Sequence, residues 1–289
     1  MQEANITNRE FPNPEIQPKF SHVKFANKYF IIIILIYLVS GIIIELINPL
    51  HQGKLFGYMQ GLAQLLLMLL PALLFSRFSP MPFKTLFRLE FKPDLKLIVL
   101  SIIGIIALYV FETTYLFLQE KLIPGFLFEI YQTTEKAINE LYTQILGGSG
   151  ILDCLFALAI GAVIPSIAEE SLFRGFYQRS LEEELKPYLA ILISGLIFAV
   201  VHLNPINFIP LIFIGLYLGV VAYGTKSLLI PILLHFLNNA VAVIIMYTPS
   251  LSQLDSQSYN LTITSAIILS LISLAVLIFV SVLIYKKGK

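Results

Sequence analysis

Eight runs of mostly apolar residues divide this chain, and most are long enough to cross a lipid bilayer as helices, which takes about 20 residues. The runs occupy residues 29–47, 56–75, 95–118, 151–175, 189–203, 208–223, 228–247 and 263–284. We therefore predict an all-α, polytopic membrane protein with about eight transmembrane helices in a conical or bundled core. The fifth and sixth runs are short, so seven spans is the nearest alternative.

The composition narrows the class of protein further. Hydrophobic residues make up 57% of the chain and charged residues 13%, which leaves far more apolar surface than a soluble enzyme could bury. The formal net charge of +1 provides no basic field for nucleic acid, so DNA and RNA are poor partners and the lipid bilayer is the expected one. The single cysteine excludes an internal disulfide and a thiolate-rich metal site.

Basic residues predict the orientation, because cytoplasmic loops hold most of the Lys and Arg. With a cytoplasmic N-terminus, only Lys54, Lys121 and Lys136 of the 19 basic residues fall on the outer side. We predict a multi-pass membrane protein with both termini cytoplasmic, in the cell membrane if the source is bacterial. Residues 1–28 are expected to form a cytoplasmic tail and residues 29–289 a single transmembrane domain.

Two features lie between the predicted spans or apart from the main polar clusters. Residues 120–146 mix aromatic and acidic side chains, which favours an amphipathic helix at the membrane interface, with a plain loop as the alternative.

Glu112 lies in the third apolar run with no basic residue within four positions. Its carboxyl group is either protonated, hydrogen-bonded to another helix, or exposed to a cavity. Of these three, we favour a structural partner on another helix.

Charged groups inside the membrane are the first place to look for function, because each costs about 3 kcal/mol to insert. Glu169, Glu170 and Arg174 lie together in the fourth run. Glu170 and Arg174 are four residues apart on one helical face and can pair, whereas Glu169 points about 100° away and can face a different cavity. The alternative is an interfacial ion-pair cluster that ends the helix.

Two histidines lie in apolar runs on other predicted helices. His202 follows Phe198 by four residues in the fifth run, and His235 precedes Asn239 by four in the seventh. A lone intramembrane histidine is often only a hydrogen-bond partner between helices. His235 and Asn239, however, share one helical face, so both can contact the same ligand atom.

Together these residue types suit hydrolysis. A carboxylate and an imidazole, Glu169 and His202, can take a proton from water, while His235 and Asn239 can stabilise the oxyanion that forms when water attacks an amide. Glu169, His202 and His235 are also the ligand types of a catalytic zinc ion. The chain has no His-Glu-x-x-His motif, so a zinc mechanism and a metal-independent glutamate mechanism both stay open.

Three short motifs follow one another on successive predicted helices. They are Glu169-Glu170-x-x-x-Arg174, Phe198-x-x-x-His202 and His235-x-x-x-Asn239. Each motif alone is weak, but the ordered trio resembles the three motifs of the CAAX-protease and bacteriocin-processing (CPBP, or Abi) intramembrane proteases. The core that carries them covers residues 150–245.

This resemblance implies an eight-helix membrane endopeptidase. Eukaryotic members of the family remove the last three residues of prenylated proteins, and bacterial members include bacteriocin-immunity and processing proteins, so the implied partner is a peptide or a prenylated protein. By analogy Glu169, assisted by His202, activates water, and His235 and Asn239 stabilise the oxyanion. Glu170 and Arg174 give support, as does Phe198. The family has been described both as zinc-dependent and as metal-independent, so the resemblance leaves the metal open.

The predicted depths of these residues disagree. Counted from the basic residues at about 1.5 Å per residue, Glu169 lies about 15 Å deep, His202 about 24 Å and His235 about 14 Å. One site on upright helices cannot have this spread. We therefore expect tilted helices, a fourth helix that continues into the cytoplasm, or a fifth helix that begins below the interface.

Three functions remain in competition. The leading one is an intramembrane endopeptidase whose cavity opens toward the cytoplasmic half. The second is a catalytically silent bacteriocin-immunity or regulatory membrane protein that keeps the site as a binding pocket. The third is a proton-coupled transporter that uses Glu112, Glu169 and the histidines, but such transporters often have duplicated halves, and here the polar clusters all lie in the second half.

Overall fold

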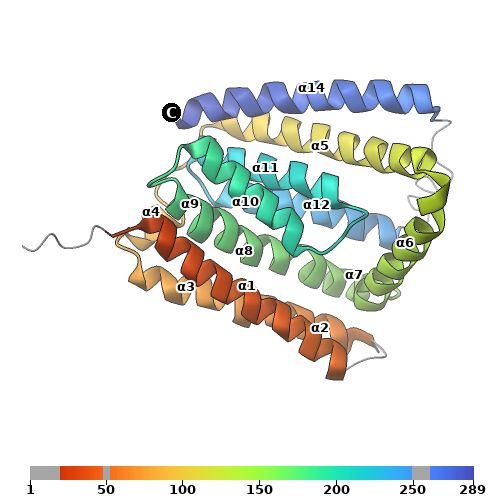
Figure 1. Ribbon diagram of the computed structural model, residues 1–289, viewed down its shortest axis with the longest axis horizontal. Coiled ribbons are helices and arrows are strands. Elements are labelled where there is room, and N and C mark those ends of the chain that lie inside the picture. Colours follow the sequence, from red (N-terminus) through yellow and green to blue (C-terminus); the bar gives the residue numbers. More distant parts are fainter. Residues whose placement is uncertain (1–19, 48–52, 249–260) are drawn as a thin grey trace, which may run out of the picture.

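The chain folds into a bundle of long helices, and residues 20–47, 53–248 and 261–289, which this computed structural model describes, contain no strand (Figure 1). The prediction of an all-α protein is confirmed. The helices are α1 (His22–Ile47), α2 (Gly53–Ala63), α3 (Leu70–Phe75), α4 (Phe83–Leu86), α5 (Leu95–Leu122), α6 (Gly125–Leu146), α7 (Ile151–Leu158), α8 (Ile164–Glu170), α9 (Arg179–Leu181), α10 (Pro187–Val201), α11 (Phe208–Thr225), α12 (Leu229–Tyr247) and α14 (Ile263–Gly288). Between them lie the π-helical stretches η1 (Gln64–Leu69), η3 (Ala159–Val163) and η4 (Ser171–Gln178), and the 3₁₀ turn η2 (Ser76–Phe78).

Seven helical segments of the described chain are long and apolar enough to cross a membrane. They are His22–Ile44, Lys54–Phe78, Leu95–Leu122, Ile151–Leu181, Phe208–Thr225, Leu229–Tyr247 and Ile263–Gly288. The one predicted span that is absent from these seven is the fifth, which corresponds to α10, an apolar helix of only 15 residues. Such a helix is about 22 Å long, less than the hydrocarbon thickness of about 30 Å.

The fourth span is the longest segment, with 31 residues from Ile151 to Leu181. The helix continues two residues beyond Arg179, to Leu181, and its continuation into the cytoplasm stays a prediction. Measured from the ends of the two helices, Glu169 lies about 18 Å from Leu181 and His202 about 22 Å from Pro187. The long fourth helix therefore brings the two side chains to a similar level.

The basic end of the bundle holds the start of α1, α4, the turn from α9 to α10, and the C-terminus of α14 (Figure 1). Arg88 and Glu182 form an ion pair of 2.5 Å there, with both side chains nearly inaccessible to solvent. Helix α1 begins at His22, so the expected tail through residue 28 is too long. The reason is that the Glu184 carboxylate accepts a hydrogen bond from the backbone N–H of His22. Residues 1–19 of that tail lie outside the described residues.

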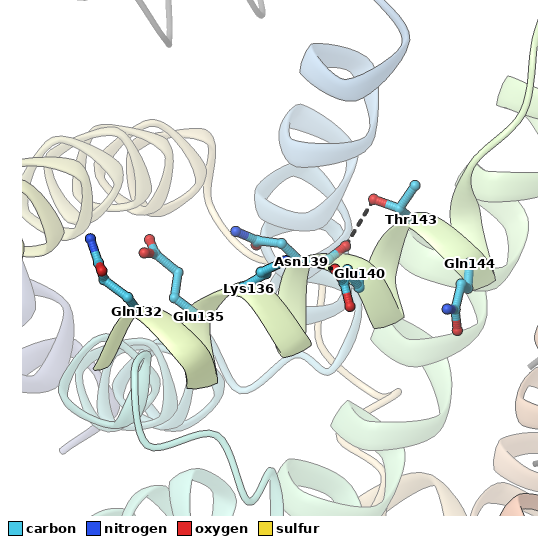
Figure 2. Close-up of a pocket in the computed structure, with 7 residues that line it drawn as sticks. All are labelled: Gln132, Glu135, Lys136, Asn139, Glu140, Thr143 and Gln144. Carbon is cyan, nitrogen blue, oxygen red and sulfur yellow. Dashed lines mark hydrogen bonds and ion pairs between the residues drawn. The ribbon is translucent and has the colours of Figure 1, made fainter. Parts of the chain in front are cut away.

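Helix α6 crosses the opposite end of the bundle at a steep angle to the long helices (Figure 1). Its polar side chains are strung along the helix, as Figure 2 shows for Gln132, Glu135, Lys136, Asn139, Glu140, Thr143 and Gln144. Exposed apolar residues such as Phe126 and Ile130 give it amphipathic character. The predicted helix over 120–146 is therefore confirmed in its type, and its position at a membrane interface stays a prediction.

The core centres on η4, all of whose residues are buried. Helices α10 and α11 pack closely beside it because glycines meet where they cross. A Cβ added to Gly215 would lie 2.7 Å from the carbonyl oxygen of Gly195, which is too close for any side chain. Small residues of this kind let membrane helices approach one another. The approach also brings the Gly215 carbonyl within 3.0 Å of Arg174.

Candidate active site

The two adjacent carboxylates of α8 face different partners, as helical geometry predicts. The Glu169 Oε2 atom lies 3.7 Å from Nε2 of His202. The Glu170 Oε1 atom lies 2.8 Å from Nη1 of Arg174 and 2.9 Å from Nδ1 of His235. The structure thus groups the predicted residues into an outer pair and a fully buried triad.

The buried triad is a charged network in the interior of the bundle. The Glu170 and Arg174 side chains have no exposed surface, and that of His235 is 5% exposed. Arg174 also donates a hydrogen bond to the Gly215 carbonyl and lies 4.5 Å from the centroid of the Phe198 ring. Because removing one partner would strand a buried charge, the triad fixes α8, α11 and α12 relative to one another.

His202 is held in one orientation at the end of α10, where it is the C-cap residue. Its Nδ1 lies 2.6 Å from the carbonyl oxygen of Phe198. A carbonyl oxygen only accepts hydrogen bonds, so Nδ1 carries the proton, and in a neutral ring Nε2 holds the lone pair. That lone pair faces the Glu169 carboxylate. The Phe198 ring packs against the imidazole at 4.5 Å, which adds to its positioning.

Asn239 is placed one helical turn after His235 and also faces the fourth span. Its Nδ2 donates a hydrogen bond to the Gly161 carbonyl at 3.2 Å. Gly161 belongs to η3, and π-helical stretches frequently occur at functional sites. One N–H of the Asn239 amide therefore donates to the backbone carbonyl, and the other N–H does not take part in that bond.

Two cavities meet at the outer pair. One, of about 640 Å³, is lined largely by apolar residues of α1 together with part of the α2–α3 segment. The other, of about 430 Å³, lies on the side of α5 and α12. Glu169, His202 and Asn239 line both cavities. These three residues therefore lie where a substrate in either cavity would meet them.

The larger cavity extends toward one end of the bundle, and the expected opening toward the cytoplasmic half stays a prediction. Its lining includes Leu46 near the C-terminus of α1, Tyr142 of α6 and Leu203 just after α10, and α6 crosses one end of the bundle (Figure 1). That end is opposite the basic one. Helices α1 and η1 also pack against η4, with Phe30 against Phe173 at 5.2 Å.

Two residues that sequence reasoning missed also contact the site. Gln64 in η1 donates a hydrogen bond of 3.4 Å from Nε2 to Glu169 Oε1. Tyr142 of α6 lines both cavities. Burial raises the pKa of the Tyr142 hydroxyl, a hydrogen bond with Asn204 partly opposes this, and the charge of Glu169 raises it further. Its phenol is therefore a neutral donor at neutral pH.

A preformed zinc site is not present in the part of the chain that the structure describes, since no three His, Cys, Asp or Glu side chains gather there as metal ligands would. Glu169 and His202 are close, and Nδ1 of His235 is bonded to Glu170, which leaves Nε2 as the nitrogen of that ring that could hold a metal. The zinc set of Glu169, His202 and His235 stays a prediction.

Comparison with known proteins finds similarities to the same segment. Residues 151–241 match the family model described as Type II CAAX prenyl endopeptidase Rce1-like. A Bacillus subtilis (strain 168) protein named "Putative membrane peptidase YdiL" is 27% identical over 145 residues, which cover 47% of this chain and 59% of that relative. No solved structure matches the chain significantly.

All three motifs lie within the matched segment. The segment that carries them is therefore similar to the Type II CAAX prenyl endopeptidase family, in agreement with the resemblance seen in the sequence.

Proposed function

We propose that this protein is an intramembrane endopeptidase in which Glu169 and His202 activate a water molecule. The observation that carries the proposal is the 3.7 Å separation of Glu169 Oε2 and His202 Nε2 at the junction of two cavities. This distance is longer than a direct hydrogen bond and fits a single water bonded to both groups. Both atoms are acceptors when His202 is neutral, so they complement the two protons of that water.

In the proposed reaction the water oxygen attacks the carbonyl carbon of the scissile amide while Glu169 accepts a proton. The C–N bond then breaks, and the same proton passes to the leaving nitrogen. His202 holds the water through Nε2 and shares the proton. Hydrogen bonding of Gln64 to the other carboxylate oxygen keeps Oε2 directed at the water.

The oxyanion that forms on the attacked carbonyl group needs hydrogen-bond donors on the side away from the water. We assign this role to the free N–H of Asn239 and to Nε2 of His235. Because Nδ1 of His235 donates to Glu170, Nε2 donates only when the ring carries a second proton. The Glu170 carboxylate accepts the Nδ1 hydrogen bond and so orients the His235 ring, and Arg174 and Phe198 hold Glu170 and that ring in place.

The larger cavity supports an apolar or lipidated substrate. Residues of α1 that line it, including Ile34, Leu38 and Ile42, are aliphatic. A prenyl chain or an apolar peptide segment would bury surface there. A prenylated natural substrate is part of this proposal. No observation favours the catalytically silent alternative or the transporter.

The test is cleavage of prenylated and plain peptides by the protein in detergent, with wild type compared with Glu169→Gln and both measured with and without a zinc chelator. The metal-independent mechanism predicts that Glu169→Gln loses about 10²- to 10⁴-fold in rate and that the chelator has no effect. If the chelator abolishes cleavage and added zinc restores it, Glu169, His202 and His235 would instead be assigned as zinc ligands. A wild type that binds but cuts no peptide would favour the silent protein.

A further inference from the structure

The smaller cavity beside the proposed catalytic pair has a polar lining that the mechanism does not use. Besides the residues it shares with the larger cavity, its lining includes a carboxyl group and three amides, from Glu112, Asn204, Asn207 and Asn238. The larger cavity is mainly aliphatic on its α1 side. The two sides of the junction therefore differ in chemistry, and a bound peptide would experience different surroundings on either side of its scissile bond.

Glu112 is the feature of this lining that needs explanation. It lies in the membrane-spanning helix α5, yet among the described residues it forms no hydrogen bond and no ion pair. No Lys or Arg lines the cavity with it. The structural partner that we expected from the sequence is therefore missing in the described part of the chain. A charged carboxyl group is costly at such a position unless something pairs with it.

Asn238 provides a second unpaired acceptor on the same cavity. Its Oδ1 is buried and has no hydrogen-bond partner within the described residues. Buried acceptors of this kind are rare in folded proteins, because each loses its bond to water without replacement. Two polar groups without a partner among the described residues, one of them a carboxyl group, complement a group that is rich in N–H donors and positively charged.

We propose that this cavity is a substrate subsite that takes the side chain of a lysine or arginine next to the scissile bond. The proposal rests on the proposed peptidase function. The side chain enters past Glu169 and His202, its cationic head pairs with Glu112, and Asn238 Oδ1 accepts one of its N–H groups. The same arrangement repels an acidic side chain, because Glu112 and Glu169 both line the cavity.

The test uses peptides that differ at one position near the scissile bond, carrying Lys, Met or Glu. Wild type is expected to cleave the Lys peptide with a kcat/KM at least about tenfold above that of the Met peptide, and the Glu peptide most slowly. Glu112→Gln should abolish the preference, so that kcat/KM for the Lys peptide falls to about that for the Met peptide measured with the same variant. Glu120→Gln, on the exposed end of the same helix, is the matched control and should keep the preference.

A binding experiment separates this inference from the proposed function. Fluorescent Lys and Met peptides are titrated onto Glu169→Gln protein, with and without the Glu112→Gln change. Tighter binding of the Lys peptide that disappears with Glu112→Gln supports the subsite even if no peptide is cut. Equal binding of both peptides, or an equal loss of both, overturns it. Should Glu112→Gln fail to fold, Asn238→Leu, which removes the second acceptor, is expected to weaken the Lys preference in the same assay.

Discussion

His235 and Glu170 are joined across two helices by a hydrogen bond of 2.9 Å between Nδ1 and Oε1. Because Glu170 is the neighbour of Glu169 in the chain, one helical turn holds both the proposed base and the group that orients the proposed oxyanion donor. The backbone of α8 thus couples the two halves of the site. A change that rotates this turn would disturb both.

Replacement of Glu170 by leucine is expected to destabilise the protein by about 3–5 kcal/mol, because it strands the Arg174 guanidinium in the interior. The additional change Arg174→Met should restore most of the stability, since an apolar pair of similar volume replaces the ion pair. Activity should stay low in the double variant, because His235 has lost its acceptor. Unfolding in detergent and peptide cleavage measure the two effects.

The matched control for this pair is Glu183→Leu. Glu183 pairs with Arg179 at the same spacing of four residues, but on the partly exposed surface of the bundle. Exposed ion pairs contribute about 0–1 kcal/mol, so this change should have little effect on stability. A loss in Glu183→Leu as large as in Glu170→Leu would show that burial is not the cause.

The change Gln64→Leu removes the hydrogen bond that holds Glu169 Oε1. We expect kcat to fall about tenfold with little change in KM, because one hydrogen bond to a charged group is worth about 1.5 kcal/mol. Gln60→Leu is the control, since Gln60 lines the same cavity without that bond. An equal effect of the two changes would mean that Gln64 acts only through the shape of the cavity.

The change Gly215→Ala should destabilise the bundle, because the added Cβ would meet the Gly195 carbonyl oxygen at 2.7 Å. The separation of α10 and α11 that follows would also draw the Gly215 carbonyl away from Arg174. Gly41→Ala provides the comparison, since a Cβ there meets nothing within 4 Å. A thermal unfolding scan of both variants should show a lower midpoint for Gly215→Ala only.

Acid should loosen the start of α1. Burial raises the pKa of the Glu184 carboxyl, but hydrogen bonds from the backbone of His22, the Ser21 hydroxyl and the backbone of Val23 lower it more, so the net pKa lies below its ordinary value. A lowered pKa means that the carboxylate stabilises the fold at neutral pH and stops doing so as the pH falls through that pKa.

Proteolysis of the N-terminal segment between pH 7 and pH 3 measures this loosening. Wild type should become more susceptible at the acid end, and Glu184→Gln should be equally susceptible at every pH. Protection that persists in Glu184→Gln at neutral pH would mean that the charge of Glu184 is not what holds α1.

The sequence was sufficient to predict the helices and the pairing within them. Apolar runs define the spans because the bilayer sets their length, and the spacing of Glu170 and Arg174 placed them on one face. The same helical geometry predicted that the side chains of Glu169 and Glu170 face different partners, and the structure agrees. These features depend on a single helix, so local pattern is enough to predict them.

Features that depend on how helices pack were out of reach. The bond between Gln64 and Glu169 joins residues 105 positions apart, and only the packing of η1 against α8 brings them together. The extent of the larger cavity depends on the same kind of packing. Gln64 did carry a signal, as a polar residue inside an apolar run.

The most direct test of the proposed catalytic pair is a double-mutant cycle on Glu169 and His202. The rate of peptide cleavage is measured for wild type, Glu169→Gln, His202→Gln and the double variant, with folding checked by unfolding in detergent. If both residues act on one water, the double variant should be about as slow as the slower single variant. If the two losses multiply instead, Glu169 and His202 act independently, and the central claim is wrong.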